Sequence, residues 1–364
     1  LIKVQLVKDY PDVLEYAATL AISYKTLGMA LVGLQEVDEA IHFYKKAILI
    51  EEQLVKDHPD IMEYASSLSS SYNDLAAALS DDKGKTDEAI EFYQKCIEIK
   101  EKLVKEQPDI TAYAINLSDP YHNLAIQLIY LGQRDKAIEL FSKDIPIKER
   151  LLIDHPNVRK YALQLLYSYN ALSRQLIAIG KTGLAINTIN KAIAIGEQRV
   201  KDHPDVLDYV VNLSSSYDNM VAALRYDGKT DEAIGFYKKA ILIRKQLVKD
   251  HPMVPSYANA LVSTQVNCGM LEQSQWLFED AIGHFESSLE LLRSLEKRGL
   301  LKLNPPGWGQ RLVQKIAFCR NANRAIEDLS FVLAQPPAEA AKLLLVRGQV
   351  KLDRNDHLAA VESA

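Results

Sequence analysis

Histidine is the residue type whose repetition first suggests chemistry in this sequence. His58, His155, His203 and His251 each stand directly before a proline, at regular intervals along the chain. A row of imidazoles can bind metal ions or sense pH, because histidine ligates metals and titrates near neutral pH. If each repeat adds two helix layers, neighbouring copies lie roughly 18–20 Å apart, which is too far for shared coordination. We therefore interpret the row as a repeated turn residue.

No other residue pattern predicts catalysis. The sequence contains no phosphate-binding G-x-x-x-x-G-K-[ST] or G-x-G-x-x-G motif and no H-E-x-x-H motif. Cys96, Cys268 and Cys319 have no C-x-x-C spacing, so we interpret them as buried thiols of a reducing compartment. The sequence thus predicts neither an enzyme nor a cofactor or metal site.

The balance of apolar and charged residues is that of an ordinary soluble protein. The 364 residues are 48% hydrophobic and 25% charged, with a net charge of −5. A general nucleic-acid-binding protein more often shows a basic face, so nucleic acid is not the predicted partner. No apolar run approaches the roughly 20 residues that span a bilayer, so membrane insertion is not expected.

The start of the chain matches the middle of a later segment. Residues 1–2 and 5–9 repeat the amino acids of residues 49–50 and 53–57. We therefore expect residues 1–10 to be the end of a preceding repeat helix, in a chain that is a fragment of a longer protein. The absence of a signal peptide is then uninformative, and a cytoplasmic location is the working expectation.

Two residue types recur on one lattice, and this lattice sets the predicted architecture. Prolines and alanines each recur every 48 residues, except for one gap of 49 in each series that spans the loop at residues 81–83. Such a period is typical of a solenoid, in which stacked units bury a continuous core. The series are Pro11, Pro59, Pro108, Pro156, Pro204 and Pro252, and Ala40, Ala89, Ala137, Ala185, Ala233 and Ala281.

Within each unit, apolar residues recur every three or four positions in two stretches that a glycine separates. This periodicity predicts two antiparallel helices of about 20 residues each. Pro59 is expected in the first turn of a first helix, and Thr86 and Thr230 are expected to cap second helices. The glycines Gly84, Gly132, Gly180 and Gly228 share one turn position, which suits a helix end with positive φ.

These residues resemble the tetratricopeptide repeat. Its pattern of a large residue, Leu beside a small residue, Gly and then Ala is matched by Tyr121, Leu124, Ala125, Gly132 and Ala137. The usual period is about 34 residues. The longer period here is similar to that of kinesin light chains and of the arrays attached to bacterial serine/threonine kinases. The resemblance implies an all-α solenoid, a right-handed superhelix of antiparallel helix hairpins.

The lattice also predicts how the chain is divided. We expect six long repeats over residues 11–299, an irregular connection over 300–309, and two standard-length units over 310–364, the last truncated. The sixth repeat is degraded, because Trp276 replaces the usual glycine and Gln265 replaces the usual tyrosine. A change in curvature is expected there.

The resemblance implies a binding groove along the first helices, which line the concave face in this family. The reference positions are the lattice tyrosines Tyr24, Tyr72, Tyr121, Tyr169 and Tyr217, whose next residue is rotated about 100° toward the inner surface. The candidate residues are Lys25, Asn73, His122, Asn170 and Asp218 directly after them, Ser70, Asp119, Tyr167 and Ser215 two positions before them, and Arg174, Tyr130, Arg225 and Tyr226 further along the same helices.

Two functions remain open at this point. The first is a protein–protein interaction scaffold that binds a peptide or a partner protein in the groove. The second is a sensory or regulatory region of a larger signalling enzyme, such as a bacterial serine/threonine kinase, with catalysis outside this chain. The family's clamp for C-terminal carboxylates is not implied, because Lys25 has no second lysine at the matching position.

Overall fold

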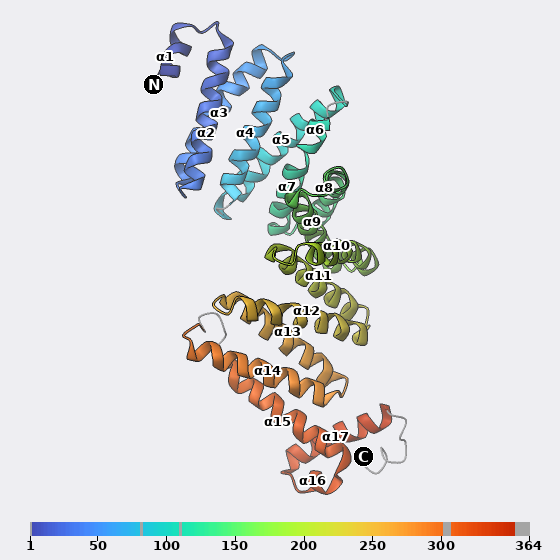
Figure 1. The fold of residues 1–364 in the computed structure, drawn as a ribbon. Helices are drawn as coiled ribbons and strands as arrows, with labels where there is room; N and C mark the ends of the chain where they lie inside the picture. The colour runs from blue at the N-terminus through green and yellow to red at the C-terminus, as the bar shows by residue number, and fades with distance from the viewer. Residues whose placement is uncertain (1, 81–82, 109–110, 301–306, 354–364) are drawn as a thin grey trace. The chain divides into compact units, whose positions relative to one another are not determined.

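The computed structural model describes residues 2–80, 83–108, 111–300 and 307–353. All regular elements in these ranges are helices, which confirms the predicted all-α fold for the described part of the chain (Figure 1). The chain divides into two units, residues 1–180 and residues 181–364. Among the described helices, none combines the length and apolar character needed to cross a membrane.

Unit 1 is a series of helices that pack in chain order. Helix α2 packs on α3, α4 on α5, and α7 on α8, while α3 with α4, α5 with α7, and α8 with α9 join successive hairpins. The elements are α1 (Ile2–Asp9), α2 (Leu14–Gly33), α3 (Val37–Asp57), α4 (Met62–Ser80), the 3-10 helix η1 (Lys83–Lys85), α5 (Thr86–Glu106), α6 (Thr111–Ile115), α7 (Ser118–Tyr130), α8 (Arg134–Asp154) and α9 (Arg159–Ala178).

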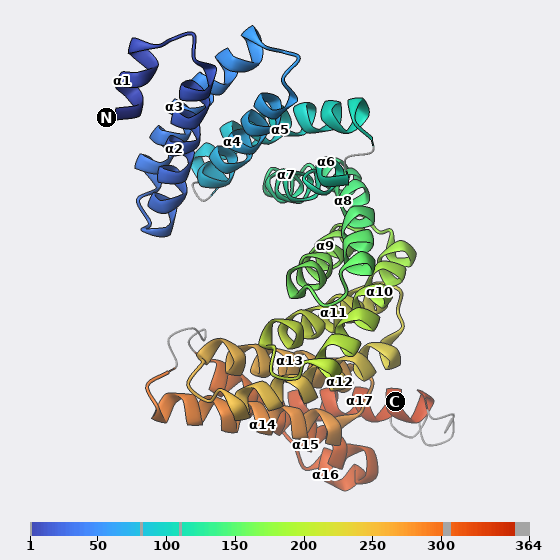
Figure 2. The ribbon, with the colours of Figure 1, turned by 45° about the horizontal axis from the view of Figure 1, so that its top comes forward.

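In unit 2, taken by itself, the described helices also pack in chain order (Figure 2). Its elements are α10 (Thr182–Asp202), α11 (Leu207–Tyr226), α12 (Thr230–Asp250), α13 (Pro255–Ser274), α14 (Phe278–Lys297), α15 (Trp308–Glu327), α16 (Leu329–Leu333) and α17 (Pro337–Asp353). Since α16 is only 5 residues long, it is shorter than the second helix of an ordinary repeat. Residues 301–306 of the expected connection and 354–364 of the expected truncated unit lie outside the described residues.

The lattice residues form the core. All six lattice alanines are 0% exposed, so a larger side chain at these helix crossings has no space. Each lattice tyrosine from Tyr72 to Tyr217 donates a hydrogen bond to a glutamate on the second helix of the preceding hairpin. The acceptors are Glu52 for Tyr72 (2.6 Å), Glu101 for Tyr121 (2.6 Å), Glu149 for Tyr169, and Glu197 for Tyr217 (2.7 Å).

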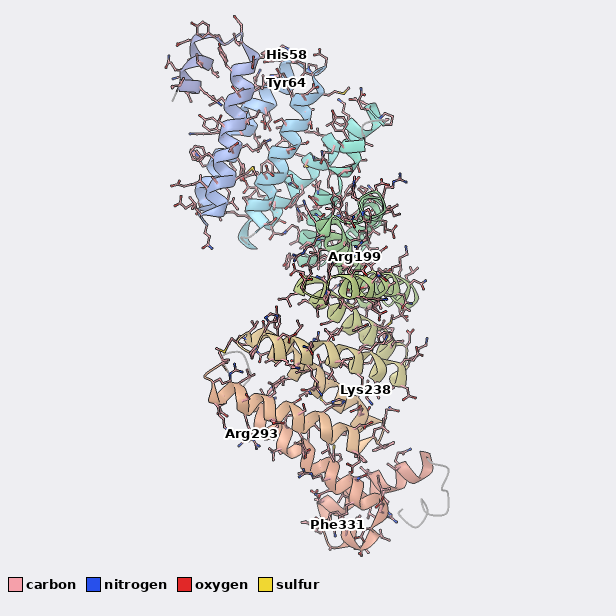
Figure 3. The ribbon with its side chains drawn as sticks, in the orientation of Figure 1. His58, Tyr64, Arg199, Lys238, Arg293 and Phe331 are labelled. Atoms are coloured by element: carbon pink, nitrogen blue, oxygen red, sulfur yellow. The ribbon has the colours of Figure 1, made fainter. Side chains whose placement is uncertain are left out.

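The recurring His-Pro pairs form the turns between repeats. The amide of Ile61 donates to the carbonyl oxygen of His58 at 3.1 Å, a β-turn with Pro59 at its second position. Pro59 therefore precedes α4, whereas the sequence placed it in the first helical turn. The ring of His58 packs on that of Tyr64, with centroids 6.5 Å apart (Figure 3). The rings of His155, His203 and His251 also pack on those of Tyr161, Tyr209 and Tyr257, at interplanar angles that vary from 37° to 73°.

The turns inside the hairpins agree with the prediction only in part. Gly132, Gly180 and Gly228 have φ between 72° and 75°, as expected for a left-handed helix end. Gly84 does not, because it lies in η1. The equivalent positions in the first and sixth repeats carry Gln35 (φ 64°) and Trp276 (φ 60°), which are strained there.

The predicted N-caps also require a correction. Thr86 and Thr230 are the first residues inside α5 and α12, and the cap positions belong to Lys85 and Lys229. Neither lysine side chain caps its helix through a hydrogen bond. Acidic residues in the first turn, such as Asp87 and Asp231, supply the favourable charge at these helix starts.

The first helix of the third repeat is broken, where the sequence period predicts a continuous helix of about 20 residues. It consists of α6 and α7, with a turn at residues 116–117 between them. Pro120 explains the break, because its missing N–H and its ring both prevent a normal helical bond to the carbonyl of Asn116. The break places residues 115–120 along a cavity described below.

Candidate functional site

The predicted inner face is open at some lattice positions and closed at others. Residues two positions before the tyrosines are exposed or half-exposed, as are most of those five positions after them. Residues directly after the tyrosines lie deeper: Lys25, Asn73, His122 and Asp218 are half-buried, and Asn170 is only 4% exposed. The accessible face is therefore formed mainly by the residues two positions before and five positions after each lattice tyrosine.

Unit 1 has a polar cavity of about 350 Å³ along α4, α7 and α9. Three predicted site residues, Ser70, Asn73 and Asp119, line it. The cavity also contains residues that the sequence did not single out: Asp74, Lys100, Ile115, Asn116, Ser118, Pro120, Leu151, Lys160, Tyr161 and Gln164. We call this the unit 1 cavity.

The chemistry of the unit 1 cavity depends on a buried ammonium group. Lys100 is 6% exposed, and burial lowers its pKa while nearby acidic groups, among them Asp74 and Asp119, oppose that effect. Burial likewise raises the pKa of Asp74, against the charge of Lys25 and a hydrogen bond from Asn73. The Oδ1 atom of Asn73 is buried without a hydrogen-bond partner among the described residues. The cavity therefore offers an acceptor for an N–H group beside a cation.

His122 belongs to a buried network and is not a free inner-face side chain. Its Nδ1 atom lies 2.9 Å from Oγ of Ser168 and 3.7 Å from Oδ2 of Asp144. Asp144 is 0% exposed and accepts hydrogen bonds from Ser118 (2.6 Å), Ser168 (2.7 Å) and Lys148 (2.8 Å). Burial acts to raise the pKa of Asp144, but the interaction with His122, the Lys148 charge and the hydrogen bonds from Lys148 and Ser118 hold it below its usual value.

The remaining unit 1 candidates differ in accessibility. Tyr130, Tyr167 and Arg174 are exposed, so they are available to a ligand. Asp119 is exposed as well and accepts a hydrogen bond of 2.8 Å from Gln164.

In unit 2 some of the predicted site residues have hydrogen-bond or ion-pair partners, and others are exposed to solvent. Asp218 is ion-paired with Arg244 of α12, whose Nη1 donates to Oδ1 at 3.0 Å. Ser215 donates to the carbonyl of Val211 on its own helix at 3.0 Å. Arg225 and Tyr226 are exposed at the end of α11.

Two adjoining cavities of about 360 Å³ each lie along α11, α13 and α15 of unit 2. Both include Ser263 and Asn267, so together they form what we call the unit 2 groove. The half that contains the Asp218–Arg244 ion pair is lined by Asp218, Val221, Ala222, Arg225, Tyr237, Arg244, Ala260 and Thr264, and the other half by Val266, Met270, Trp308, Arg311, Leu312 and Lys315.

Sequence reasoning missed the charged residues that reach this face from second helices. They occur eleven residues after a lattice alanine, at Glu51, Lys100, Lys148 and Arg244, and all four are buried. The sequence did carry a signal for them, because four of the six residues at this position of the repeat are charged. Trp308 and Lys315 were missed for a different reason, because they follow the six long repeats and have no lattice position.

Comparisons with known proteins agree with this geometry. The family model described as tetratricopeptide repeat matches residues 20–60, 68–109 and 213–252, which confirms the resemblance drawn from the sequence. No curated protein matches this sequence.

Among similar solved structures, two with a TM-score of at least 0.50 have the same fold. The S. pombe nuclear import adaptor Nro1 has a TM-score of 0.55 at 11% identity, covering 84% of this chain and 99% of that one. BtubC (BKLC) from P. vanneervenii has a TM-score of 0.50 at 18% identity, covering 74% and 94%. The TPR-like repeats of a candidate kinesin light chain from Podosopora anserina are 21% identical, covering 64% and 97%, with a TM-score of 0.46.

Proposed function

We propose that this chain, an array of tetratricopeptide repeats, is a protein–protein interaction scaffold that binds an extended peptide segment along its first helices. The observation that carries this proposal is the unit 2 groove, where a cavity that contains the Asp218–Arg244 ion pair adjoins a more apolar cavity. Peptide-binding sites combine pockets for side-chain anchors with polar groups that satisfy the peptide backbone. The groove supplies both next to each other.

The lining residues favour a peptide with a large apolar side chain beside an acidic one. Met270, Trp308 and Leu312 provide apolar walls, and a flexible methionine with an aromatic ring adapts well to such an anchor. Arg311 and Lys315 line the same cavity and favour a carboxylate nearby. Ser263 and Asn267, shared by both cavities, are placed to bond the peptide backbone.

The unit 1 cavity supports a second contact of a different kind. Its buried acceptor on Asn73 and the ammonium of Lys100 suit the N–H and C=O groups of a peptide bond. We propose that this cavity by itself binds the backbone and polar side chains of a peptide.

A regulatory region of a larger signalling enzyme would use the same surfaces. A catalytic domain encoded in the same reading frame would distinguish that role from an independent scaffold. We propose a cytoplasmic location in either case. The buried free thiols Cys96, Cys268 and Cys319 suit a reducing compartment.

The test is selection of peptides from a phage-displayed library of short random sequences on the full chain. We expect enrichment of sequences that pair Leu, Phe or Trp with Asp or Glu. Met270→Glu and Lys315→Glu should abolish binding of the selected peptides. Leu242→Glu, which changes a more exposed apolar residue on the second helix α12, outside the groove, should leave binding unchanged. Equal enrichment on the Met270→Glu protein would refute the assignment of this groove.

A further inference from the structure

Glu272 on α13 lies at a register that every earlier repeat fills with leucine. The equivalent residues are Leu31, Leu79, Leu128, Leu176 and Leu224, and all are buried. Glu272 is 0% exposed, and neither of its carboxylate oxygens has a hydrogen bond within the described residues. An ionised carboxylate in such a place is unfavourable unless a cation or metal compensates it. The other five repeats show that leucine fits this register.

Two further residues next to Glu272 also depart from the lattice. Cys268, one helical turn earlier on α13, replaces a leucine or methionine, and His284 on α14 stands where three of the other five repeats have phenylalanine. The ligand atoms of the three residues all lie within 4.8 Å of one another. The Nε2 atom of His284 is 3.5 Å from Oε1 of Glu272, close to the separation of about 3.3 Å between two ligands of one tetrahedral zinc ion.

We propose that Cys268, Glu272 and His284 form a binding site for a divalent transition-metal cation, with zinc(II) best suited to the donor set. Mixed sulfur, nitrogen and oxygen donors are typical of zinc. A thiolate and a carboxylate balance the charge of the ion, so the buried site becomes neutral. Three protein ligands leave one coordination position for water or for a group from a partner.

The alternative account is that Lys238 alone neutralises Glu272. The Nζ atom of Lys238 lies 3.4 Å from Oε1 of Glu272, near enough for an ion pair but without hydrogen-bond geometry. Lys238 is half-exposed and lies 3.5 Å from Asp280, so it has a second carboxylate partner when Glu272 turns to a metal. An ion pair with Lys238 also does not explain why Cys268 and His284 meet at the same point.

Binding of cobalt(II), a spectroscopic substitute for zinc(II), to the full chain tests the site directly. We expect one tightly bound ion per chain and a thiolate-to-cobalt charge-transfer absorption that zinc(II) removes. Cys268→Ala should abolish this absorption, and Glu272→Leu should lower the affinity by a factor on the order of 100 or more. Cys319→Ala, which removes another buried thiol of unit 2, should retain both signals.

Thermal unfolding keeps the proposal falsifiable if a variant is less stable. Zinc(II) should raise the unfolding temperature of the wild type and of Cys319→Ala, because a ligand that binds only the folded state stabilises it. Glu272→Leu should unfold at a higher temperature without metal and lose the response to zinc(II). Lys238→Met should bind cobalt(II) more tightly, since it removes a competing cation. The absence of charge-transfer absorption in the wild type, or its persistence in Cys268→Ala, would overturn the proposal.

Discussion

The hydroxyl of Tyr121 donates a hydrogen bond of 2.6 Å to the carboxylate of Glu101, and this bond joins two successive hairpins of unit 1. Burial and the bond to Glu101 raise the pKa of Tyr121, so the hydroxyl remains a donor. The same pair recurs with a separation of 20 residues in three other repeats. In the sixth repeat both members differ, since Gln265 and Lys245 occupy the positions of tyrosine and glutamate. The bond is thus a repeated connection that the sixth repeat lacks.

Tyr121→Phe should lower the free energy of unfolding by about 1 kcal/mol. A hydrogen bond to a charged group contributes more than this, roughly 1.5–3 kcal/mol, but Glu101 is half-exposed and partly solvated. Urea denaturation provides the measurement. Tyr24→Phe is the matched control, because the Tyr24 hydroxyl has no hydrogen bond to a described residue, and it should change stability very little. Equal losses in the two variants would contradict the role of the bond.

Lys148→Met should destabilise unit 1 by about 3 kcal/mol, because it leaves the buried carboxylate of Asp144 without its cation. The double variant Asp144→Ala with Lys148→Met should recover most of that loss. Alanine already occupies the register of Asp144 at Ala47, Ala192 and Ala240. Urea denaturation of the two single variants and the double variant measures the coupling. Simple additivity of the single effects would contradict the ion pair.

Acid should weaken unit 1 through Asp144. Its pKa lies below the ordinary value in the folded state, since hydrogen bonds and Lys148 outweigh the effect of burial. The folded state therefore binds this proton less readily than the unfolded state does. The resulting stabilisation is fully present above the unfolded pKa of about 3.9 and is lost as the pH falls through the folded pKa. Denaturation curves from about pH 6 to pH 3 should show a smaller loss in Asp144→Ala than in the wild type.

The helical architecture was predictable because it depends on short-range periodicity. The 48-residue lattice identified the hairpins, and the lattice alanines are buried as that register requires. Local departures from the regular helices could not be predicted from the repeat period. The break at Pro120 follows from one residue that interrupts an otherwise regular pattern, and the period alone does not reveal it.

For the candidate site, the sequence predicted only on which side of a first helix each residue lies. Periodicity shows which side of a first helix a residue occupies, and it led to Asn73, Asp119 and Asp218, which line cavities. It does not show what reaches that side from a neighbouring helix. His122 and Asp218 are engaged by Asp144 and Arg244 from second helices, so Nδ1 of His122 and both carboxylate oxygens of Asp218 are already occupied.

Gly132→Ala should lower stability by about 1–2 kcal/mol, although a Cβ atom at this position meets nothing within 4 Å. The cost is that of the backbone, which has φ 73° there. Gln35→Gly, at the equivalent turn of the first repeat, should raise stability by about 0.5–1 kcal/mol, because glycine relieves the strain at φ 64°. Thermal unfolding of both variants measures the two opposite shifts. A stabilising Gly132→Ala would show that the turn relaxes to another conformation.

The sixth repeat should be the least protected part of α11–α14. It lacks the tyrosine–glutamate bond, it places Trp276 at positive φ, and it buries Glu272 in a leucine register. The missing bond and the buried Glu272 weaken the packing of α13 on α12, and Trp276 strains the turn from α13 to α14, so local opening should require less free energy there than at α11. Hydrogen exchange of the metal-free chain should therefore be faster in α13 than in α11. Uniform protection over the two helices would contradict this prediction.

Restoring the missing pair should reverse the difference. Gln265→Tyr together with Lys245→Glu recreates the 20-residue spacing that joins Tyr217 to Glu197. The new bond replaces two that Gln265 makes, one donated to Ser287 at 2.7 Å and a longer one accepted from Ser288 at 3.3 Å, and it adds a charged acceptor. If the net gain is about 1 kcal/mol, exchange in α13 slows by a factor of about 5. Lys245→Glu alone is the control and should leave exchange unchanged, because the glutamate then has no tyrosine donor.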